Sequence, residues 1–363
     1  MSAGPLAGLK VLEFAAIGPV PYCGMLFSDM GADVLRIDRP GAQYDRFMVE
    51  TRGRRSLVLD LKEPRDVQTA LRLAGKADVL LEGLRPGVME RLGVGPDVAL
   101  ACNPKLVYGR MTGWGQEGPY AQLPGHDINF VAISGALHAI GTPERPVPPL
   151  NLVGDFGGGA LHLAVGVLAA LRHVQGGGPG QVIDCAMSDG AAALMGMLYG
   201  HLARGSWKDE RGANIIDGGA PFYGVYRCSD GAWIAVGAIE PQFFSALVRG
   251  AGLDAAWQVD AHDESTWPAR RIVLEKLFAT RTRAEWLALL EHTEACVVPV
   301  NAMGEAAAHA HNRARSTFTT VDDVVQPAPV PRFSATPAGI RHGPVNAGEG
   351  GAAALADWGV DRA

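Results

Sequence analysis

The amino-acid sequence predicts an α/β protein, and three observations lead to this class. Short apolar runs alternate with helical patterns through the first half of the chain, as in βαβ units that build a mostly parallel sheet. Alternating strands joined by a Ser-Asp-Gly turn begin a second, smaller α+β unit after residue 218. Hydrophobic residues make up 48% of the 363 residues, which is enough for a sizeable core in two domains.

The expected elements of the first unit follow in chain order, and each predicted strand is a short apolar run. These strands are residues 9–14, 32–38, 56–61, 77–82, 106–111 and 181–187. Helical patterns fall between them, for instance at residues 22–30, 64–74 and 156–174. The glycine-rich run at 176–180 ends the last of these helices and leads into the final strand.

The second half of the chain is organised around a hairpin at residues 223–237. Helical patterns follow it at residues 242–250, 270–280 and 283–292. From residue 326 the chain is rich in Pro, Gly and Ala, and we expect parts of it to lie extended over the surface. The predicted boundaries are a large domain at 1–187, a linker at 188–218, a small domain at 219–315 and a C-terminal segment at 316–363.

Composition excludes several classes of function. The net charge of -6 offers no basic surface for nucleic acid. Five scattered cysteines form neither a disulfide framework nor a zinc site, which favours a reducing, cytoplasmic compartment. His309 and His311 diverge on a helix and have no third ligand at suitable spacing, so no metal is expected. No run of 18 uncharged apolar residues forms a plausible membrane span.

The segment Gly113–Gly118 matches the G-x-G-x-x-G pattern of dinucleotide-binding loops and follows a predicted strand. Pro119 and Pro124 prevent the long helix that would hold a pyrophosphate, and no acidic strand end lies about 20 residues further on. We therefore interpret this segment as a loop whose glycines let the backbone approach a ligand closely.

His126 and Asp155 form a candidate acid/base pair, because each lies at a glycine-containing turn beside a predicted element. Structural explanations exist for both: His126 can be an ordinary loop residue, and Asp155 can cap the helix that follows it. However, Phe156–Gly159 is a poor first turn by helix propensity. These glycines would let a substrate carbonyl approach exposed N–H groups, which would stabilise an enolate oxygen.

The stretch Pro146–Asp155 resembles the corresponding stretch of the α-methylacyl-CoA racemases, a branch of the family III CoA-transferase (CaiB/BaiF-type) superfamily. Further motifs similar to those of the family occur in order along most of the chain. They are residues 31–40, 82–87, 91–93, 112–119, 125–129, 154–159 and 236–243. The C-terminal third lacks clear motifs.

The resemblance implies a Rossmann-like large domain, completed by the C-terminal segment, and an interlocked homodimer. It also implies that His126 is a general base and that Asp155 is its partner on the opposite face of the substrate. Transferases of the superfamily usually have tyrosine at the position of His126, so the histidine favours the racemase branch. In the racemases a glutamate at the position of Glu240 contacts the histidine, and in an interlocked dimer it would do so across the interface.

Coenzyme A would be bound as part of the substrate, and no separate cofactor is implied. Arginine and lysine are the usual partners of its phosphates. Arg39 and Arg85 follow the ends of predicted strands, and the family uses residues at such strand ends to bind the nucleotide. The candidate substrate- and CoA-binding residues are Arg39, Lys62, Arg85, Arg91, Gly125, Gly157 and Gly158. Each of the four basic residues can equally be a solvated surface charge.

The expected function is therefore the interconversion of (R)- and (S)-2-methylacyl-CoA thioesters by a 1,1-proton transfer through an enolate. Two alternatives remain open at this point. In a CoA-transferase, Asp155 would instead attack the thioester as a nucleophile. In a non-catalytic acyl-CoA-binding protein, the site would serve for ligand binding alone. The acyl group stays undetermined, because apolar residues such as Met187 and Met197 can line a site or a core.

Overall fold

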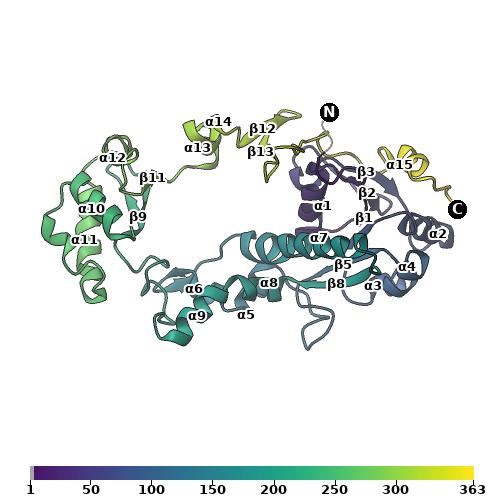
Figure 1. Cartoon of the computed structure of the whole chain (residues 1–363), viewed down its shortest axis with the longest axis horizontal. Helices are drawn as coiled ribbons and strands as arrows, with labels where there is room; N and C mark the ends of the chain where they lie inside the picture. Colours follow the sequence, from purple (N-terminus) through teal and green to yellow (C-terminus); the bar gives the residue numbers. More distant parts are fainter. Residues whose placement is uncertain (1–3) are drawn as a thin grey trace. The chain divides into compact units, whose positions relative to one another are not determined.

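The structure is a computed structural model that describes residues 4–363, and the chain divides into two compact units (Figure 1). The first unit contains the chain up to Ser134, Pro149–Met195 and Arg313–Ala363, and the second contains Gly135–Pro148 and Gly196–Asn312. Residues 135–148, which the sequence boundaries assign to the large domain, thus belong to the second unit. The boundary near Met195 also falls within the segment predicted as a linker.

A parallel six-stranded sheet forms the centre of the first unit, with the strand order β3-β2-β1-β4-β5-β8. Its strands are β1 (Lys10–Phe14), β2 (Asp33–Asp38), β3 (Arg55–Val58), β4 (Val79–Glu82), β5 (Val107–Thr112) and β8 (Gln181–Ala186). All neighbouring strands in it pair in parallel. Each lies within a few residues of its predicted range, and the mixed α/β class is confirmed.

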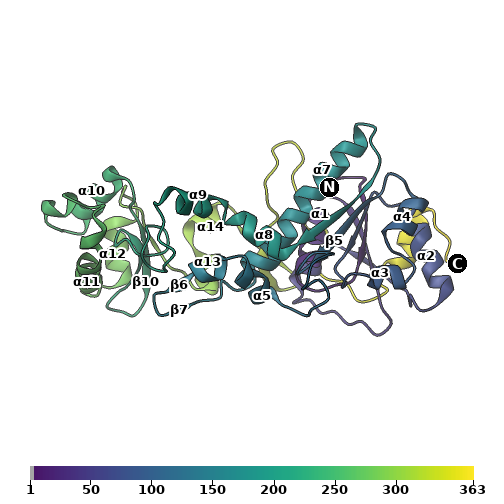
Figure 2. The ribbon, with the colours of Figure 1, turned by 90° about the horizontal axis from the view of Figure 1, so that it is seen from below.

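Successive residues of the strands face opposite sides of the sheet, and each side has its own core. Val11 packs in one cluster with α1 (Pro19–Asp29) and α7 (His162–Gln175). Leu12 packs in the other with α2 (Pro64–Ala74), α4 (Pro96–Cys102) and α15 (Gly351–Trp358). Figure 2 shows α15, from the C-terminal segment, close to α2 and α4.

The C-terminal segment is more regular than the sequence predicts. Besides α15, it contains a hairpin of β12 (Phe318–Val321) and β13 (Val324–Pro327). Asp322 and Asp323 form its two-residue turn with φ of 50° and 62°, as the favoured hairpin turns require.

The helix predicted at 156–174 begins earlier and in an unexpected form. A π-helix covers Leu152–Leu161 and continues directly into α7. The combined helix Leu152–Gln175 contains an 18-residue window with a mean hydropathy of 1.5, and it is long and apolar enough to cross a membrane by length and composition. The criterion of 18 uncharged residues misses this helix, because Asp155 interrupts the run of uncharged residues. Within the described chain one face of α7 is buried in the core, including Leu163 and Val167. A core helix can pass the same test of length and composition.

The second unit is built on a three-stranded antiparallel sheet with the order β11-β10-β9. The predicted hairpin is present as β9 (Tyr223–Arg227) and β10 (Trp233–Gly237), and β11 (Val297–Pro299) completes the sheet. Three helices pack with it around a shared core, namely α10 (Pro241–Gly250), α11 (Trp267–Phe278) and α12 (Arg283–Leu290).

Shorter elements complete both units. They are α3 (Val88–Arg91), α5 (Asp127–Ile133), α6 (Ala136–Ala139), β6 (Gly141–Thr142), β7 (Arg145–Pro146), α8 (Met187–Leu194), α9 (Gly196–Arg204), α13 (Met303–Ala308), α14 (Ala310–Ala314) and three short 3-10 helices, Val49–Thr51, Ala255–Gln258 and Glu264–Thr266.

Candidate active site

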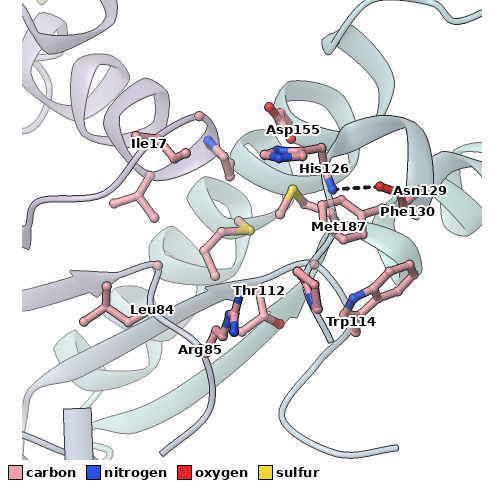
Figure 3. Close-up of a pocket in the computed structure, with 18 of the residues that line it drawn as sticks. Ile17, Leu84, Arg85, Thr112, Trp114, His126, Asn129, Phe130, Asp155 and Met187 are labelled. Carbon is pink, nitrogen blue, oxygen red and sulfur yellow. Dashed lines mark hydrogen bonds between the residues drawn. The ribbon is translucent and has the colours of Figure 1, made fainter. Parts of the chain in front are cut away.

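A cavity of about 760 Å³ lies in the first unit, where the carboxyl ends of β4 and β5 continue into loops. Gly83–Pro86 follow β4 and line one part of it, and Gly113 and Trp114 follow β5 and line another. The amino end of α1, the start of α5 and the π-helix complete the wall (Figure 3). Open parallel sheets characteristically bind ligands at this edge.

His126 is the residue immediately before α5, and its side chain lines the cavity. Its backbone N–H donates to the side-chain oxygen of Asn129 at 3.0 Å, which fixes the start of the helix. The extended backbone at His126, with φ of -128° and ψ of 172°, is the conformation usual before a helix. The imidazole is exposed, so it is accessible to a ligand.

Asp155 lies beside His126 in the same cavity wall, and its side chain is half-buried in the π-helix (Figure 3). π-Helical turns occur often at functional sites. The Asn151 amide donates to Asp155 Oδ2 at 3.4 Å, and the Asp155 backbone N–H donates to Asp127 Oδ1 at 2.7 Å. Burial raises the pKa of the Asp155 carboxyl, the Asp127 charge raises it further, and Asn151 and His126 oppose the increase.

Gly18, at the start of α1, allows the chain to approach this carboxylate. Its φ is 70°, and a Cβ atom there would lie 3.0 Å from Asp155 Oδ2. Sequence reasoning interprets Gly18-Pro19 only as a turn into a helix and overlooks Asn151 altogether. The available signal for Gly18 is its place in the loop that follows a strand of a parallel sheet, where ligands bind.

The glycines near Asp155 have different surroundings from those the sequence suggests. Gly125 lines the cavity, whereas Gly157 and Gly158 do not belong to its lining. A Cβ atom on Gly158 would lie 2.6 Å from the Ala191 backbone nitrogen and 2.9 Å from the Gly190 carbonyl carbon. The glycine therefore permits close packing of the π-helix against α8.

Two N–H groups at this turn are also engaged within the protein, where the sequence predicts N–H groups that face a substrate oxygen. The Asp155 N–H donates to Asp127, and the Phe156 N–H donates to the Asn151 carbonyl at 3.3 Å. The side chain of Phe156 stacks on Tyr22 of α1, with ring centroids 4.5 Å apart. The aromatic contact holds this turn against α1.

The basic residues predicted to bind CoA occupy different places in the first unit. Arg85 lines the cavity with His126. Arg39 and Lys62 line a second cavity of about 670 Å³, which shares Ile17, Gly18 and Leu84 with the first. Arg91 is exposed at the end of α3 and lines neither of these two cavities.

Asp38 and Tyr44 line the second cavity and belong to a polar cluster that also includes Arg36. The Tyr44 hydroxyl donates to Asp38 Oδ1 at 2.6 Å, and the Arg36 guanidinium lies 3.6 Å from the centroid of the Tyr44 ring. Burial, followed by the hydrogen bond to Asp38, raises the pKa of Tyr44. The phenol therefore stays neutral, and the cavity contains aromatic surface next to cationic side chains.

The remaining candidates lie in the second unit or on other surfaces. Glu240 is the residue before α10 in the second unit, and its side chain is exposed. His309, also in the second unit, has its Nε2 atom 3.6 Å from Glu291 Oε1. Among residues 4–363 no group of three or more His, Cys, Asp or Glu side chains is arranged to hold a metal ion.

Comparisons with known proteins show the family of this chain. Residues 6–349 match the family model described as CoA-transferase family III. The chain is 45% identical to the α-methylacyl-CoA racemase of Mus musculus and 44% identical to that of Homo sapiens, in each case covering 92% of this chain and 87% of the relative. The crystal structure of a CAIB/BAIF family protein from Brucella suis superposes with a TM-score of 0.84 at 26% identity, covering 98% of this chain and 100% of that chain.

Proposed function

The chain belongs to CoA-transferase family III, and from this premise we propose that it is an α-methylacyl-CoA racemase. It would interconvert the (R) and (S) forms of 2-methylacyl-CoA thioesters. The observation that carries the proposal is the presence of His126 and Asp155 side by side in one cavity wall, together with the 45% identity to a racemase.

The reaction moves one proton off the α-carbon and another onto its opposite face. In one direction the neutral His126 imidazole removes the proton, and the protonated Asp155 carboxyl donates its own proton to the other face of the planar enolate. In the reverse direction the Asp155 carboxylate is the base, and the His126 imidazolium is the acid. The raised pKa of Asp155 supports the acid half of its role.

The α-carbon of a thioester is a weak acid, so stabilising the enolate oxygen must lower most of the barrier. The N–H groups beside Asp155 are already used. We assign this role instead to the amino end of α5, which begins at Asp127 directly after His126 and faces the cavity. The positive end of a helix attracts developing negative charge.

The two adjoining cavities suit the two ends of one elongated ligand. We place the thioester and acyl group in the cavity with His126 and the nucleotide in the cavity with Arg39 and Lys62. Arg85 would interact with the CoA portion between them, and Arg91 would bind at the outer edge. Remote binding energy of this kind fixes the α-carbon between the two proton-transfer groups.

We also propose a Rossmann-like large domain and an interlocked, cytoplasmic homodimer. Three apolar side chains are exposed at the end of the π-helix and on α7, namely Leu161 (47%), Val165 (67%) and Leu168 (37%), and Val182 on the edge strand β8 is 41% exposed. Exposed apolar surface along a sheet edge favours association. In such a dimer Glu240 of the partner subunit would hydrogen-bond His126 and orient its imidazole.

The test uses a single enantiomer of 2-methylacyl-CoA in deuterated water. The native protein should racemise the thioester and incorporate deuterium at the α-carbon. His126→Ala and Asp155→Asn should each abolish racemisation, because either missing partner blocks the full transfer. The remaining group can still exchange a proton on its own face, so the two variants should exchange opposite enantiomers.

The alternatives predict different products in the same samples. A transferase would form a covalent acyl adduct on Asp155, visible by mass spectrometry, and would leave the α-proton in place. A protein that only binds acyl-CoA would show neither adduct nor exchange. Either result with the native protein would overturn the racemase proposal. Sedimentation that shows a stable, active monomer would contradict the dimer.

A further inference from the structure

We propose that Asp127 is a positioning residue for the reaction: its buried carboxylate fixes the backbone at Asp155, and its negative charge makes Asp155 hold its proton more tightly. The inference rests on the racemase proposal for its role in the reaction, but its structural basis is independent. Asp127 is bonded to His126 in the chain and hydrogen-bonded to Asp155 in space, so it links the two proton-transfer groups.

The contact between Asp127 and the π-helix is close and depends on a glycine. Asp127 is 8% exposed, and its Oδ1 accepts the Asp155 N–H at 2.7 Å. A Cβ atom on Gly154 would overlap Oδ1 and would lie 2.9 Å from the Asp127 Cγ atom. The Gly-Asp order at 154 and 155 therefore allows this carboxylate to reach the backbone of the next residue.

The charge of Asp127 is not neutralised by a cation in the described part of the chain. Its second oxygen, Oδ2, is buried and has no hydrogen-bond partner among residues 4–363. No salt bridge among these residues includes Asp127 or Asp155. A buried charge without a counter-ion acts strongly on its neighbours, because little solvent screens it.

Some groups around Asp155 raise the pKa of its carboxyl and others lower it. Burial raises its pKa most, and the Asp127 charge adds to the increase, whereas the Asn151 hydrogen bond and the His126 charge lower it. Gly18, which packs against the carboxylate from α1, carries no charge. An ordinary aspartic acid, with a pKa of about 3.9, is almost fully ionised at neutral pH and is a rare proton donor. An increase brings the pKa of Asp155 closer to the pKa of a histidine, as proton transfer in both directions requires.

Asp127→Asn separates the charge from the hydrogen bond, because an amide oxygen can still accept the Asp155 N–H. In this variant Asp155 should titrate at lower pH than in the native protein. The acidic limb of kcat/KM for racemisation should shift the same way, so activity at acidic pH relative to the optimum should rise by about threefold. Activity at the optimum should fall for both enantiomers, because fewer molecules hold the proton on Asp155 when it is the acid, and its carboxylate is a weaker base in the reverse direction.

Carbon-13 spectra of protein labelled at aspartate carboxyls provide a second measurement that needs no activity. The Asp155 signal is assigned by its absence from Asp155→Asn. Asp127→Ser, which also keeps a hydrogen-bond acceptor without the charge, serves if the asparagine variant does not fold. Asp97→Asn, an equal charge change at an exposed residue of α4, is the matched control and should leave the Asp155 titration unchanged.

The outcomes are distinct. Asn151→Ala should move the Asp155 titration to higher pH, opposite to Asp127→Asn, because it removes a donor to the carboxylate. An unchanged titration and an unchanged acidic limb in both neutral Asp127 variants would overturn the inference and reduce Asp127 to a structural contact. If the native protein racemises no 2-methylacyl-CoA, the racemase proposal fails, but the Asp155 titration still decides the effect of Asp127.

Discussion

Replacing Gly190 with alanine should destabilise the first unit through one backbone contact. Gly190 lies within α8, opposite Gly158 of the π-helix. A Cβ atom there would overlap the Gly158 carbonyl oxygen and lie 2.5 Å from its carbonyl carbon and 2.7 Å from its Cα. All three are backbone atoms, so no side chain can rotate away, and the two helices must separate by roughly 1 Å to restore normal carbon contacts.

The magnitude follows from two opposing effects. Overpacking of a tight core costs about 1–3 kcal/mol, and a contact with backbone belongs at the upper end. Alanine gains up to about 1 kcal/mol over glycine in a helix. The expected net loss is about 2 kcal/mol in the free energy of unfolding. Because Asp155 is only three residues before Gly158, the displacement should also lower kcat.

The assay is urea unfolding followed together with hydrogen exchange of the peptides that cover α8 and the π-helix. Faster hydrogen exchange in these peptides assigns a loss of stability to this contact, even if the two units unfold separately. Gly200→Ala, in helix α9, is the control, since no atom lies within 4 Å of its added Cβ. It should stabilise the protein by up to about 1 kcal/mol and leave kcat unchanged. Equal stabilisation by both substitutions, with native exchange and kcat in Gly190→Ala, would refute the reasoning.

Three further predictions concern other parts of the chain. Arg39→Ala should raise KM for CoA thioesters and leave kcat nearly unchanged, because the proposed phosphate contact is remote from the reacting carbon; an unaltered KM would exclude Arg39 from binding. Asp155→Asn should stabilise the first unit at neutral pH relative to the native protein, and the gain should shrink as the pH falls through the raised pKa of Asp155; unfolding at a series of pH values measures the trend, and a gain that grows on acidification would contradict it. Thr282→Ala should cost about 1 kcal/mol in the second unit, because Thr282 accepts the Glu285 N–H at 3.3 Å in a capping box; calorimetry of the variant would show no change if the cap were unimportant.

Local patterns in the sequence determined much of the secondary structure of this protein and its candidate catalytic residues. The apolar runs of the central sheet, the hairpin at 223–237 and the glycine stop after α7 depend on residues near in sequence, and the structure contains all of them. His126 and Asp155 were identifiable as candidates for the same reason, since each lies at a turn beside a regular element. The resemblance to the CoA-transferase family, which the family model confirms, added the chemistry that joins them.

Other features were decided only by tertiary structure. The π-helical start, the packing of Gly158 against Gly190 and the hydrogen bond from Asp155 to Asp127 each depend on contacts between segments far apart in sequence. Helix periodicity cannot distinguish a glycine that faces a ligand from one that faces another backbone. Nor can a run of residues show that a carboxylate is buried without a counter-ion. Burial and neighbouring charge set the proton affinity of a carboxyl group, and both arise only when the chain has folded.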